Sequence, residues 1–503
     1  MIFEGGEKMK NLKKLTLLHS NDLHGDFLAE KVDEKLIGGV SRLSGYVNKV
    51  CNEEKNVIYT ISGDMFRGSL VDSEFQGLST IEIINMLAPD VVTVGNHEAD
   101  YGLAHMLFIE KCAAFPIINA NMYIKYISKR LFNSHYIKEV DGMRILFIRI
   151  LTEEVLKNTK SEGLVGTLID IQDAIEEVSK ICDAYRTEDI DMTILLTHIG
   201  IEEDKKLAAA LDPACGVDII IGGHSHTLLS EPVVIAGIPI VQAAIGTDQI
   251  GRFDIMVDTD NNCIDSYTWK CIPVTEENCP RDEALEKVVI EYKDFTDQKY
   301  GRILARFPRA YTHPRRNMET ELGDLLAECM RDQLGVDLVL LGSGSIRLPS
   351  LGPLVTVKDF MEVFPFAQPM MGFRLSGRQL RHVVKYMLRE ESFIDSEHNE
   401  WFQFSKGFCC EFDRGNHTIL SLKMRGKEVE DDDLFTVVMQ EFFFENIKDF
   451  LDLPHEEIQK YGRPIEVATK APNVLEEYFK DHESLKLDEE ARLIIHNSPQ
   501  DQC

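Results

Sequence analysis

The feature that most constrains the fold is a regular alternation over the first 270 residues. Short apolar runs alternate there with amphipathic stretches such as Val40–Val50 and Ile171–Tyr185. This pattern predicts a layered α/β domain in which the strands are buried on both faces. The predicted strands are Leu15–Leu18, Val57–Ile61, Val91–Val94, Ile117–Ile118, Ile145–Ile150, Thr193–Leu196, Asp218–Ile221 and Pro239–Gln242.

Five of these predicted strands end in the same way, because polar residues of the kinds that bind metals follow each apolar run. A lone Asp-x-His or Gly-Asp is a weak signal, since most such occurrences are incidental turn chemistry. Five in succession, each after a strand, favour a site at the carboxyl ends of parallel strands. The five polar segments are His19–His24, Ser62–Asp64, Gly95–Asp100, Thr197–His198 and Gly222–His226.

The residue types in these segments suit Mn²⁺, Fe, Co²⁺ or Zn²⁺, because they offer carboxylate, amide and imidazole ligands without a thiolate. Asp22 and His24 lie two residues apart, and so do His224 and His226, so each pair shares one face of an extended segment. Asp64 follows a glycine and is the natural bridge between two cations about 3.5–4 Å apart. His19 lies at the end of an apolar run, and we expect it to be a buried, hydrogen-bonded histidine instead of a ligand.

The remaining sequence predicts a second domain joined by a helix. Residues 276–301 are charged and helical in pattern, and they separate a catalytic domain at 1–275 from a second domain at 302–503. Beyond this linker, Glu319–Leu334 and Gly377–Arg389 are predicted helices. Ser376 with Gln379 forms a capping-box pattern before the second of them.

The composition limits the partners and the compartment. The chain has 84 acidic residues against 54 lysines and arginines, a formal net charge of −30. Such a surface disfavours nucleic acid polymers and anionic membranes, whereas bound cations still allow an anionic small molecule. The short apolar run near the start does not resemble a secretory signal, and 11 scattered cysteines without a Cys-x-x-Cys pair indicate reduced thiols. We therefore expect a cytoplasmic protein without a membrane span, and the oligomeric state stays open.

The segments LTLLHSNDLHGDF and PDVVTVGNHEAD, with the order of motifs over residues 22–226, resemble the 5′-nucleotidase family of the calcineurin-like metallophosphoesterase superfamily. Bacterial UDP-sugar hydrolases that act as 5′-nucleotidases are members of it. The resemblance implies an αββα sandwich followed by an α+β nucleotide-binding domain, with two divalent metal ions of unknown identity. One ion would be held by Asp22, His24, Asp64 and His226, and the other by Asp64, Asn96, His198 and His224.

The resemblance also implies a mechanism. A metal-bound hydroxide would attack phosphorus in line, and the two cations would stabilise the charge on the phosphoryl oxygens. His97 and Asp100 would form the catalytic pair that assists the leaving alkoxide. Residues three apart meet on one helical face, so we expect a helix to start near Asn96.

Four residues of the second half match substrate-binding positions of the family. HPRRNMETELGDLL gives Arg316, GSGSIR gives Arg347, VFPFAQP gives Phe366 and MQEFFFENIKDF gives Phe442. Two aromatic rings would stack on the base and the arginines would hold the phosphate end. Gly342 and the segment 446–449 depart from the family pattern. A run of three phenylalanines, such as the one that begins at Phe442, more often belongs to a hydrophobic core than to a base-binding site.

The function implied is hydrolysis of nucleoside 5′-monophosphates in nucleotide catabolism, with UDP-sugars and 2′,3′-cyclic nucleotides as further substrates. Two alternatives stay open at this point. The same dinuclear site could act on another ester, such as a sugar phosphate or a thiosulfate ester. The chain could also bind metal or nucleotide without turnover, although the intact His97–Asp100 pair argues against this.

Overall fold

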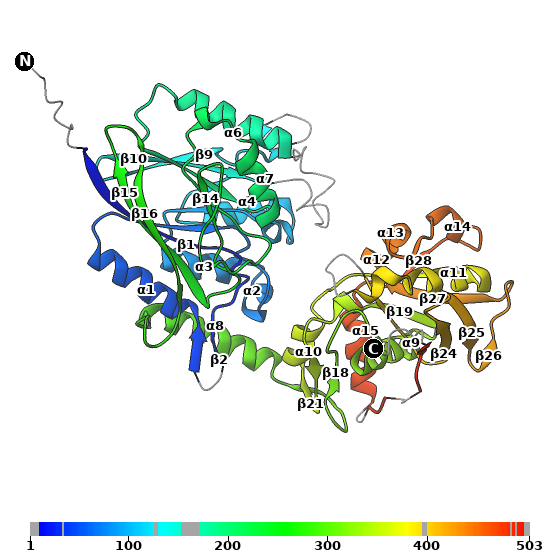
Figure 1. Ribbon diagram of the computed structural model, residues 1–503. Helices are drawn as coiled ribbons and strands as arrows, with labels where there is room; N and C mark the ends of the chain where they lie inside the picture. Colours follow the sequence, from blue (N-terminus) through cyan, green and yellow to red (C-terminus); the bar gives the residue numbers. More distant parts are fainter. Residues whose placement is uncertain are drawn as a thin grey trace, which may run out of the picture. The chain divides into compact units, whose positions relative to one another are not determined.

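The computed structural model describes residues 10–32, 35–124, 129–151, 171–394, 400–482, 485–487 and 490–496 (Figure 1). The chain divides into two compact units, Met1–Thr296 and Asp297–Cys503. Within the described ranges, no helix combines the length and apolar character that a membrane span requires.

The first unit contains two six-stranded sheets. In spatial order, the first sheet consists of β16 (Cys263–Pro273), β15 (Gln249–Asp258), β1 (Leu12–Ser20), β4 (Val57–Ser62), β5 (Val91–Thr93) and β6 (Ile117–Ile118). The second consists of β13 (Val233–Ile235), β14 (Ile238–Val241), β12 (Ile219–Ile221), β11 (Met192–Thr197), β10 (Met143–Ile150) and β9 (His135–Val140).

The two sheets pack face to face, with helices on both outer faces. Leu17 of β1 and Phe147 of β10 share one core between the sheets. The neighbouring residues point to the outer faces. Leu18 of β1 belongs to a core with helices α1 (Val40–Glu53), α3 (Leu78–Leu87), α4 (Leu103–Cys112) and α8 (Glu283–Tyr300). Leu146 of β10 belongs to a core with helices α6 (Ile171–Tyr185) and α7 (Ile201–Ala210). This period of two explains why the central strands, such as β4, β11 and β12, are largely apolar on both faces. The predicted αββα sandwich is therefore confirmed.

Strand direction places the site. In the first sheet β1, β4, β5 and β6 run parallel, and in the second β10, β11, β12 and β14 run parallel. The five polar segments accordingly follow β1, β4 and β5 of one sheet and β11 and β12 of the other. The segments thus meet at the carboxyl ends of parallel strands, as predicted, and these strands come from both stacked sheets.

Helix α8 runs through the division between the two units. Leu285 and Val289 are buried in the core of the first unit. The residues of α8 from Asp297 onward belong to the second unit. The first unit also contains a short helix, α2 (Leu70–Glu74), and a two-stranded ribbon, β2 (Ala29–Val32) with β3 (Lys35–Gly38).

The second unit is of the predicted α+β type. Its main sheet consists of β23 (Phe402–Phe404), β19 (Leu338–Gly342), β27 (Leu434–Gln440), β22 (Met370–Ser376) and β28 (Ile465–Ala468). A four-stranded sheet consists of β26 (Lys427–Glu428), β25 (Thr418–Met424), β24 (Phe408–Asp413) and β29 (Leu493–His496). The helices include α9 (Glu321–Leu334), α10 (Val357–Val363), α11 (Gly377–Met387), α12 (Glu441–Glu445), α13 (Ile447–Leu451), α14 (His455–Gln459) and α15 (Ala471–Asp481).

The capping prediction for α11 is confirmed. The Ser376 hydroxyl accepts the backbone N–H of Gln379, and the Gln379 side chain accepts the backbone N–H of Ser376. This reciprocal pair satisfies two N–H groups that the first turn of a helix leaves without partners.

Candidate metal centre

The loops that follow the five strands bring their polar side chains together at one place in the first unit. Three overlapping groups of side chains have ligand atoms that all lie within 4.8 Å of one another. Two of the groups share Asp64, the residue that the sequence suggested as a bridge. The groups are Asp22–His24–His226, His24–Asp64–His97 and Asp64–His198–His224.

The backbone at this centre is unusual, because several of its non-glycine residues have a positive φ. Asp22, His24 and Asp64 have φ values of 51°, 49° and 51°, and His224 and His226 have values of 81° and 51°. A left-handed conformation costs an L-residue about 1–2 kcal/mol. Strain of this kind concentrates at functional sites, where the surrounding structure maintains it.

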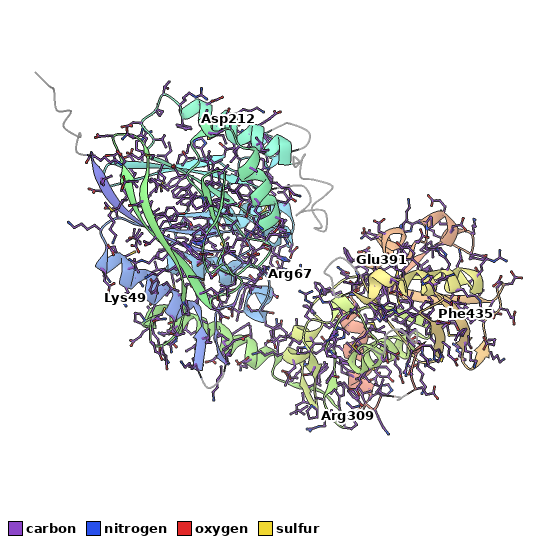
Figure 2. All side chains as sticks on the ribbon, viewed as in Figure 1. Lys49, Arg67, Asp212, Arg309, Glu391 and Phe435 are labelled. Atoms are coloured by element: carbon purple, nitrogen blue, oxygen red, sulfur yellow. The ribbon has the colours of Figure 1, made fainter. Side chains whose placement is uncertain are left out.

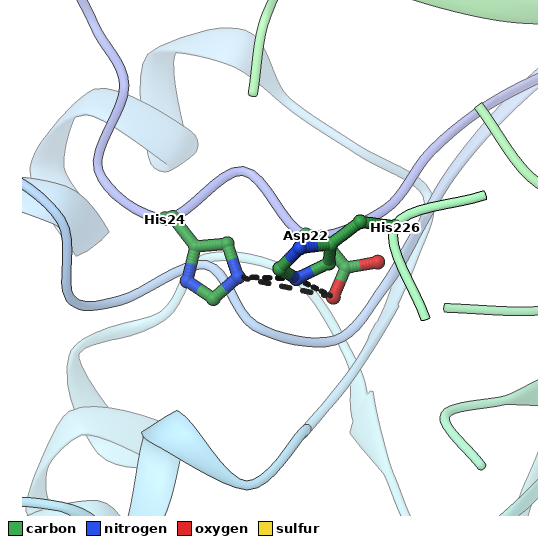
Figure 3. A group of neighbouring side chains, drawn as sticks. All are labelled: Asp22, His24 and His226. Atoms are coloured by element: carbon green, nitrogen blue, oxygen red, sulfur yellow. Dashed lines mark hydrogen bonds and ion pairs between the residues drawn. The ribbon is translucent and has the colours of Figure 1, made fainter. Parts of the chain in front are cut away.

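His24 is oriented as a metal ligand would be. Its Nδ1 lies 3.2 Å from the carbonyl oxygen of Phe66 and 3.1 Å from that of Arg67, so Nδ1 carries the hydrogen. The remaining lone pair, on Nε2, faces Nε2 of His226 at 3.1 Å and Oδ1 of Asp22 at 3.9 Å (Figure 3). Lone pairs and a carboxylate that converge in this way repel one another unless a cation lies among them.

His198 gives the same indication from the other side of Asp64. It is fully buried, and its Nδ1 lies 2.8 Å from the carbonyl oxygen of Ser62. Its Nε2 approaches Oδ2 of Asp64 to 3.1 Å and Oδ1 of Asp22 to 3.7 Å, yet no described residue gives this atom a hydrogen bond. Although burial opposes a charged ring, the two carboxylates raise the pKa of His198 to about 9. A site that attracts a proton this strongly also attracts a metal cation.

His224 completes the group next to Asn96. Its Nδ1 lies 3.1 Å from Oδ1 of Asn96, and its backbone N–H donates to the carboxylate of Asp22. Burial and the nearby His198 lower the pKa of His224 to about 4, so the ring is neutral near pH 7. Neutral imidazole and amide oxygen are both suitable ligands. The residues present therefore fit divalent cations.

His97 and Asp100 meet as the spacing predicted. His97 is the first residue of a short 3₁₀ helix, His97–Ala99, and Asp100 directly follows it; Nδ1 of His97 lies 2.6 Å from Oδ2 of Asp100. The backbone N–H of His97 donates to Oδ1 of Asp64 at 3.0 Å, which ties the pair to the ligand groups. Burial opposes protonation of the ring, but Asp64 and Asp100 together raise the pKa of His97.

His19 is buried, as predicted, and lies outside the ligand groups. Its Nε2 accepts a hydrogen bond from the indole N–H of Trp269 at 3.1 Å. Burial lowers the pKa of His19 to about 3, so the ring is neutral.

Two buried carboxylates that the sequence pattern did not single out, Glu98 and Asp204, support the ligand loops. Glu98 accepts the backbone N–H groups of Asp64 at 3.1 Å, of Met65 at 2.7 Å and of Gly95. Asp204 of α7 accepts the hydroxyl of Thr197 at 2.6 Å, next to His198. Glu98 lies inside the Gly-Asn-His-Glu motif and could have been noticed there. Nothing in the sequence distinguishes Asp204 from the exposed acids beside it.

Two of the residues predicted to bind substrate in the second unit lie together. The guanidinium of Arg347 lies over the ring of Phe366, 5.7 Å from its centroid. Arg316 is exposed. Burial raises the pKa of Glu400 to about 7, while the positive charges of Arg316 and Arg347 lower it. The Glu400 carboxylate accepts the backbone N–H of Gly344 at 2.8 Å, so this acid also belongs to the same region and was missed.

The phenylalanine run is divided between two environments. Phe443 and Phe444 are buried, whereas Phe442 is half-buried and its ring contacts those of Phe443 and Phe450. The ring of Phe443 fills the space that a side chain at Gly342 would need. The glycine at that position, which departs from the family pattern, is thus explained by packing.

Two family models match the chain. The model for calcineurin-like phosphoesterases matches residues 15–228, and the model for the 5′-nucleotidase C-terminal domain matches residues 299–452. The first range contains all the candidate metal ligands, and the second contains the four residues predicted to bind substrate.

Curated relatives agree with these matches. The trifunctional nucleotide phosphoesterase protein YfkN of Bacillus subtilis is 26% identical over 421 residues, which are 74% of this chain and 27% of that longer protein. The 5′-nucleotidase of Mus musculus is 25% identical over 421 residues, which are 74% of this chain and 71% of the mouse protein.

Solved structures share the fold over almost the whole chain. A 5′-nucleotidase precursor from Thermus thermophilus has a TM-score of 0.77 at 22% identity and covers 97% of this chain and 100% of its own. The sulfate thiohydrolase SoxB from the same genus has a TM-score of 0.67 at 16% identity, with 96% of each chain covered. By its two matched domains, which together span most of the chain, the protein is a phosphoesterase of the calcineurin-like superfamily and a member of the 5′-nucleotidase family.

Proposed function

We propose that the protein hydrolyses nucleoside 5′-monophosphates with the help of two divalent cations held on either side of Asp64. The observation that carries this proposal is the position of Asp64, whose carboxylate belongs both to a group with His24 and to a group with His198. A shared carboxylate is typical of sites in which two cations act on one phosphoryl group. The names of the mouse and Bacillus relatives support nucleotides as the substrates.

The bound cations would supply an activated water nucleophile and neutralise negative charge on the phosphoryl oxygens. The side chains of the protein account for the rest. The His97 side chain is about one-third exposed and its Nδ1 is held by Asp100, which leaves Nε2 as the ring nitrogen that would face a substrate. Burial opposes protonation, but Asp64 and Asp100 raise the pKa of His97, and Asp100 also fixes the orientation of the ring, which suits it to protonate the departing 5′-oxygen.

The second unit would bind the nucleoside. The pairing of Arg347 with Phe366 places a cation beside an aromatic face, a combination that suits a base stacked next to a charged group. The exposed Arg316 adds a further positive charge to a protein that is otherwise strongly acidic. We propose that these side chains select a nucleotide over a simple phosphate ester.

The test is hydrolysis of AMP, glucose 6-phosphate, UDP-glucose, cyclic AMP and a thiosulfate ester. The product measured is phosphate for the first two, a nucleoside monophosphate for UDP-glucose and cyclic AMP, and sulfate for the thiosulfate ester. Each substrate is tested after chelation and again after separate addition of Mn²⁺, Zn²⁺, Co²⁺ or Mg²⁺. We expect AMP to be hydrolysed fastest and only with metal. Asp64→Asn should abolish turnover, and His97→Asn should lower kcat by about 10²–10⁴-fold.

A matched control is Arg186→Met, which removes a charge from an exposed ion pair of the first unit. Its turnover should equal that of the wild type. Preference for the thiosulfate ester or glucose 6-phosphate over AMP would refute the nucleotide assignment. Wild-type turnover in both Asp64→Asn and His97→Asn would refute the assigned site. Nucleotide binding by calorimetry without phosphate release would favour a binding protein.

A further inference from the structure

We infer that Arg67 is a positioning residue that holds the His97–Asp100 pair in the geometry needed for departure of the leaving group. This inference rests on the proposed function. Arg67, labelled in Figure 2, lies in the loop that follows β4, three residues after Asp64. Its Nη1 lies 2.6 Å from Oδ2 of Asp100. The same oxygen lies 2.6 Å from Nδ1 of His97.

Two donors on one carboxylate oxygen fix that carboxylate more firmly than one donor does. Asp100 has only a 10% exposed side chain, so water offers it little competing hydrogen bonding. If the guanidinium were removed, His97 would be the remaining strong donor to this oxygen, and the carboxylate could rotate about its Cβ–Cγ bond. The imidazole would then lose the fixed orientation that proton transfer to a leaving group requires.

The backbone of Arg67 is held in place independently of its side chain. Its φ is 68°, in the left-handed region, and its N–H donates to Oδ2 of Asp72 at 2.9 Å. Asp72 is fully buried and also accepts the hydroxyls of Tyr101 and Thr80. The conformation of residue 67 is therefore imposed by its surroundings and should survive a change of side chain.

The carbonyl of Arg67 connects the same residue to the metal ligands. It lies 3.1 Å from Nδ1 of His24 and so helps to fix the hydrogen on that nitrogen. One residue thus orients a candidate metal ligand through its backbone and the proton donor through its side chain. Because a side-chain substitution leaves the carbonyl in place, the two effects can be separated by mutation.

The Arg67 side chain is 34% exposed, so its guanidinium could instead contact the phosphoryl group directly. The two roles predict different kinetics. A residue that acts through His97 matters only when the leaving group needs a proton. A residue that binds the phosphoryl oxygens matters for every leaving group, and it matters whether or not His97 is present.

The experiment compares AMP with its analogue in which sulfur replaces the bridging 5′-oxygen. Both present the same nucleoside and phosphoryl group, but a thiolate leaves without protonation because thiols have a pKa of about 8.5. In the metal-loaded enzyme, we expect Arg67→Met to lower kcat for AMP about 10-fold or more, a part of the 10²–10⁴-fold that general acid catalysis supplies. For the thio analogue, Arg67→Met should lower kcat by less than about 3-fold. Arg67→Lys should recover part of the loss, since it keeps a positive charge and an N–H donor.

A double-mutant cycle with His97→Asn completes the test. In that background Arg67→Met should change kcat for AMP little further, and Arg186→Met should change it in neither background. Equal losses with oxygen and sulfur leaving groups, or a full effect of Arg67→Met without His97, would overturn the inference while leaving the proposed function intact. Absence of phosphate release from AMP by the wild type would instead overturn the proposed function. Thermal unfolding of each variant verifies folding, and should Arg67→Met not fold, Arg67→Gln takes its place with the same expectations.

Discussion

The packing of Phe443 against Gly342 leads to a prediction that can be worked out from the structure. Gly342 ends β19 with φ −60° and ψ 127°, a conformation that alanine adopts without strain. A Cβ at this position would lie 2.8 Å from Cε1 of Phe443 and closer still to Cζ and Cε2. Such separations are shorter than contacts between carbon atoms allow. The backbone conformation at position 342 would therefore tolerate alanine, but the new methyl group would clash with the ring of Phe443 and strain the core.

The magnitude follows from how firmly the ring is held. Phe443 packs against Phe402, Phe442 and Phe450 with centroid distances of 5.3, 5.2 and 5.6 Å, so it cannot move away easily. Overpacking of a well-packed core costs about 1–3 kcal/mol, and the entropic benefit of replacing glycine is only about 0.4–1 kcal/mol. We expect Gly342→Ala to lower the free energy of unfolding of the second unit by about 1–2 kcal/mol.

The chain provides a convenient probe for this unit. It has two tryptophans, Trp269 in the first unit and Trp401 in the second. Trp401 is buried, and its carbonyl accepts the N–H of Ser343, next to the mutated position. In a Trp269→Phe background, urea unfolding followed by fluorescence reports the second unit alone.

Phe443→Leu removes the ring atoms that the new methyl group would contact. Gly342→Ala should therefore cost less in the Phe443→Leu background than in the wild type, by about 1 kcal/mol or more of coupling energy. Purely additive losses, or a Gly342→Ala variant as stable as the wild type, would refute the packing explanation for this glycine.

Three further predictions concern both units. Glu98→Gln should weaken metal binding about 10–100-fold, because an amide cannot accept all the backbone N–H groups that this carboxylate accepts. Calorimetric titration with metal measures the affinity, and an unchanged affinity would contradict this prediction. Removal of the metal by a chelator should lower the unfolding temperature of the first unit, because the converging lone pairs of the ligands are then left without a cation. The fluorescence of Trp269 in a Trp401→Phe variant reports this unfolding, and an unchanged temperature would count against metal at this site. Burial, with a smaller effect of Arg316, lowers the pKa of His313 to about 4, so the unfolded chain binds a proton that the folded chain does not between pH 6.5 and 4. Stability of the second unit should consequently fall as the pH drops through this window, and His313→Gln should reduce that fall relative to the wild type in urea titrations at pH 7 and pH 5.

Much of the metal centre could be predicted because its candidate ligands lie in short sequence motifs, each close to the end of a strand. Each candidate ligand follows a buried strand within a few residues, and parallel strands bring such positions to one edge. The contact between His97 and Asp100 followed from a spacing of three residues in the same way. A layered α/β domain was predictable from the alternation of apolar strands and amphipathic helices, whereas the αββα order was implied only by the resemblance to the family.

The supporting residues could not be predicted because their roles depend on contacts between distant segments. Asp204 lies on a helix with other acids, and only the folded chain shows that it alone faces Thr197. The contact between Arg67 and Asp100 depends on the left-handed backbone conformation of Arg67, which sets the direction of its side chain. In the second unit, the arrangement of Gly342 and Phe443 required knowing that two segments about 100 residues apart share one space.

The left-handed conformations of the candidate ligands have a consequence for engineering this protein. Asp22, His24, Asp64, His224 and His226 each adopt a backbone that glycine or asparagine would tolerate more readily. A screen for heat resistance in the absence of metal would accordingly accept replacements at these five positions and return more stable proteins that no longer bind metal. Laboratory evolution of this scaffold has to select for turnover at every round, because durability and catalysis make opposite demands on the same residues.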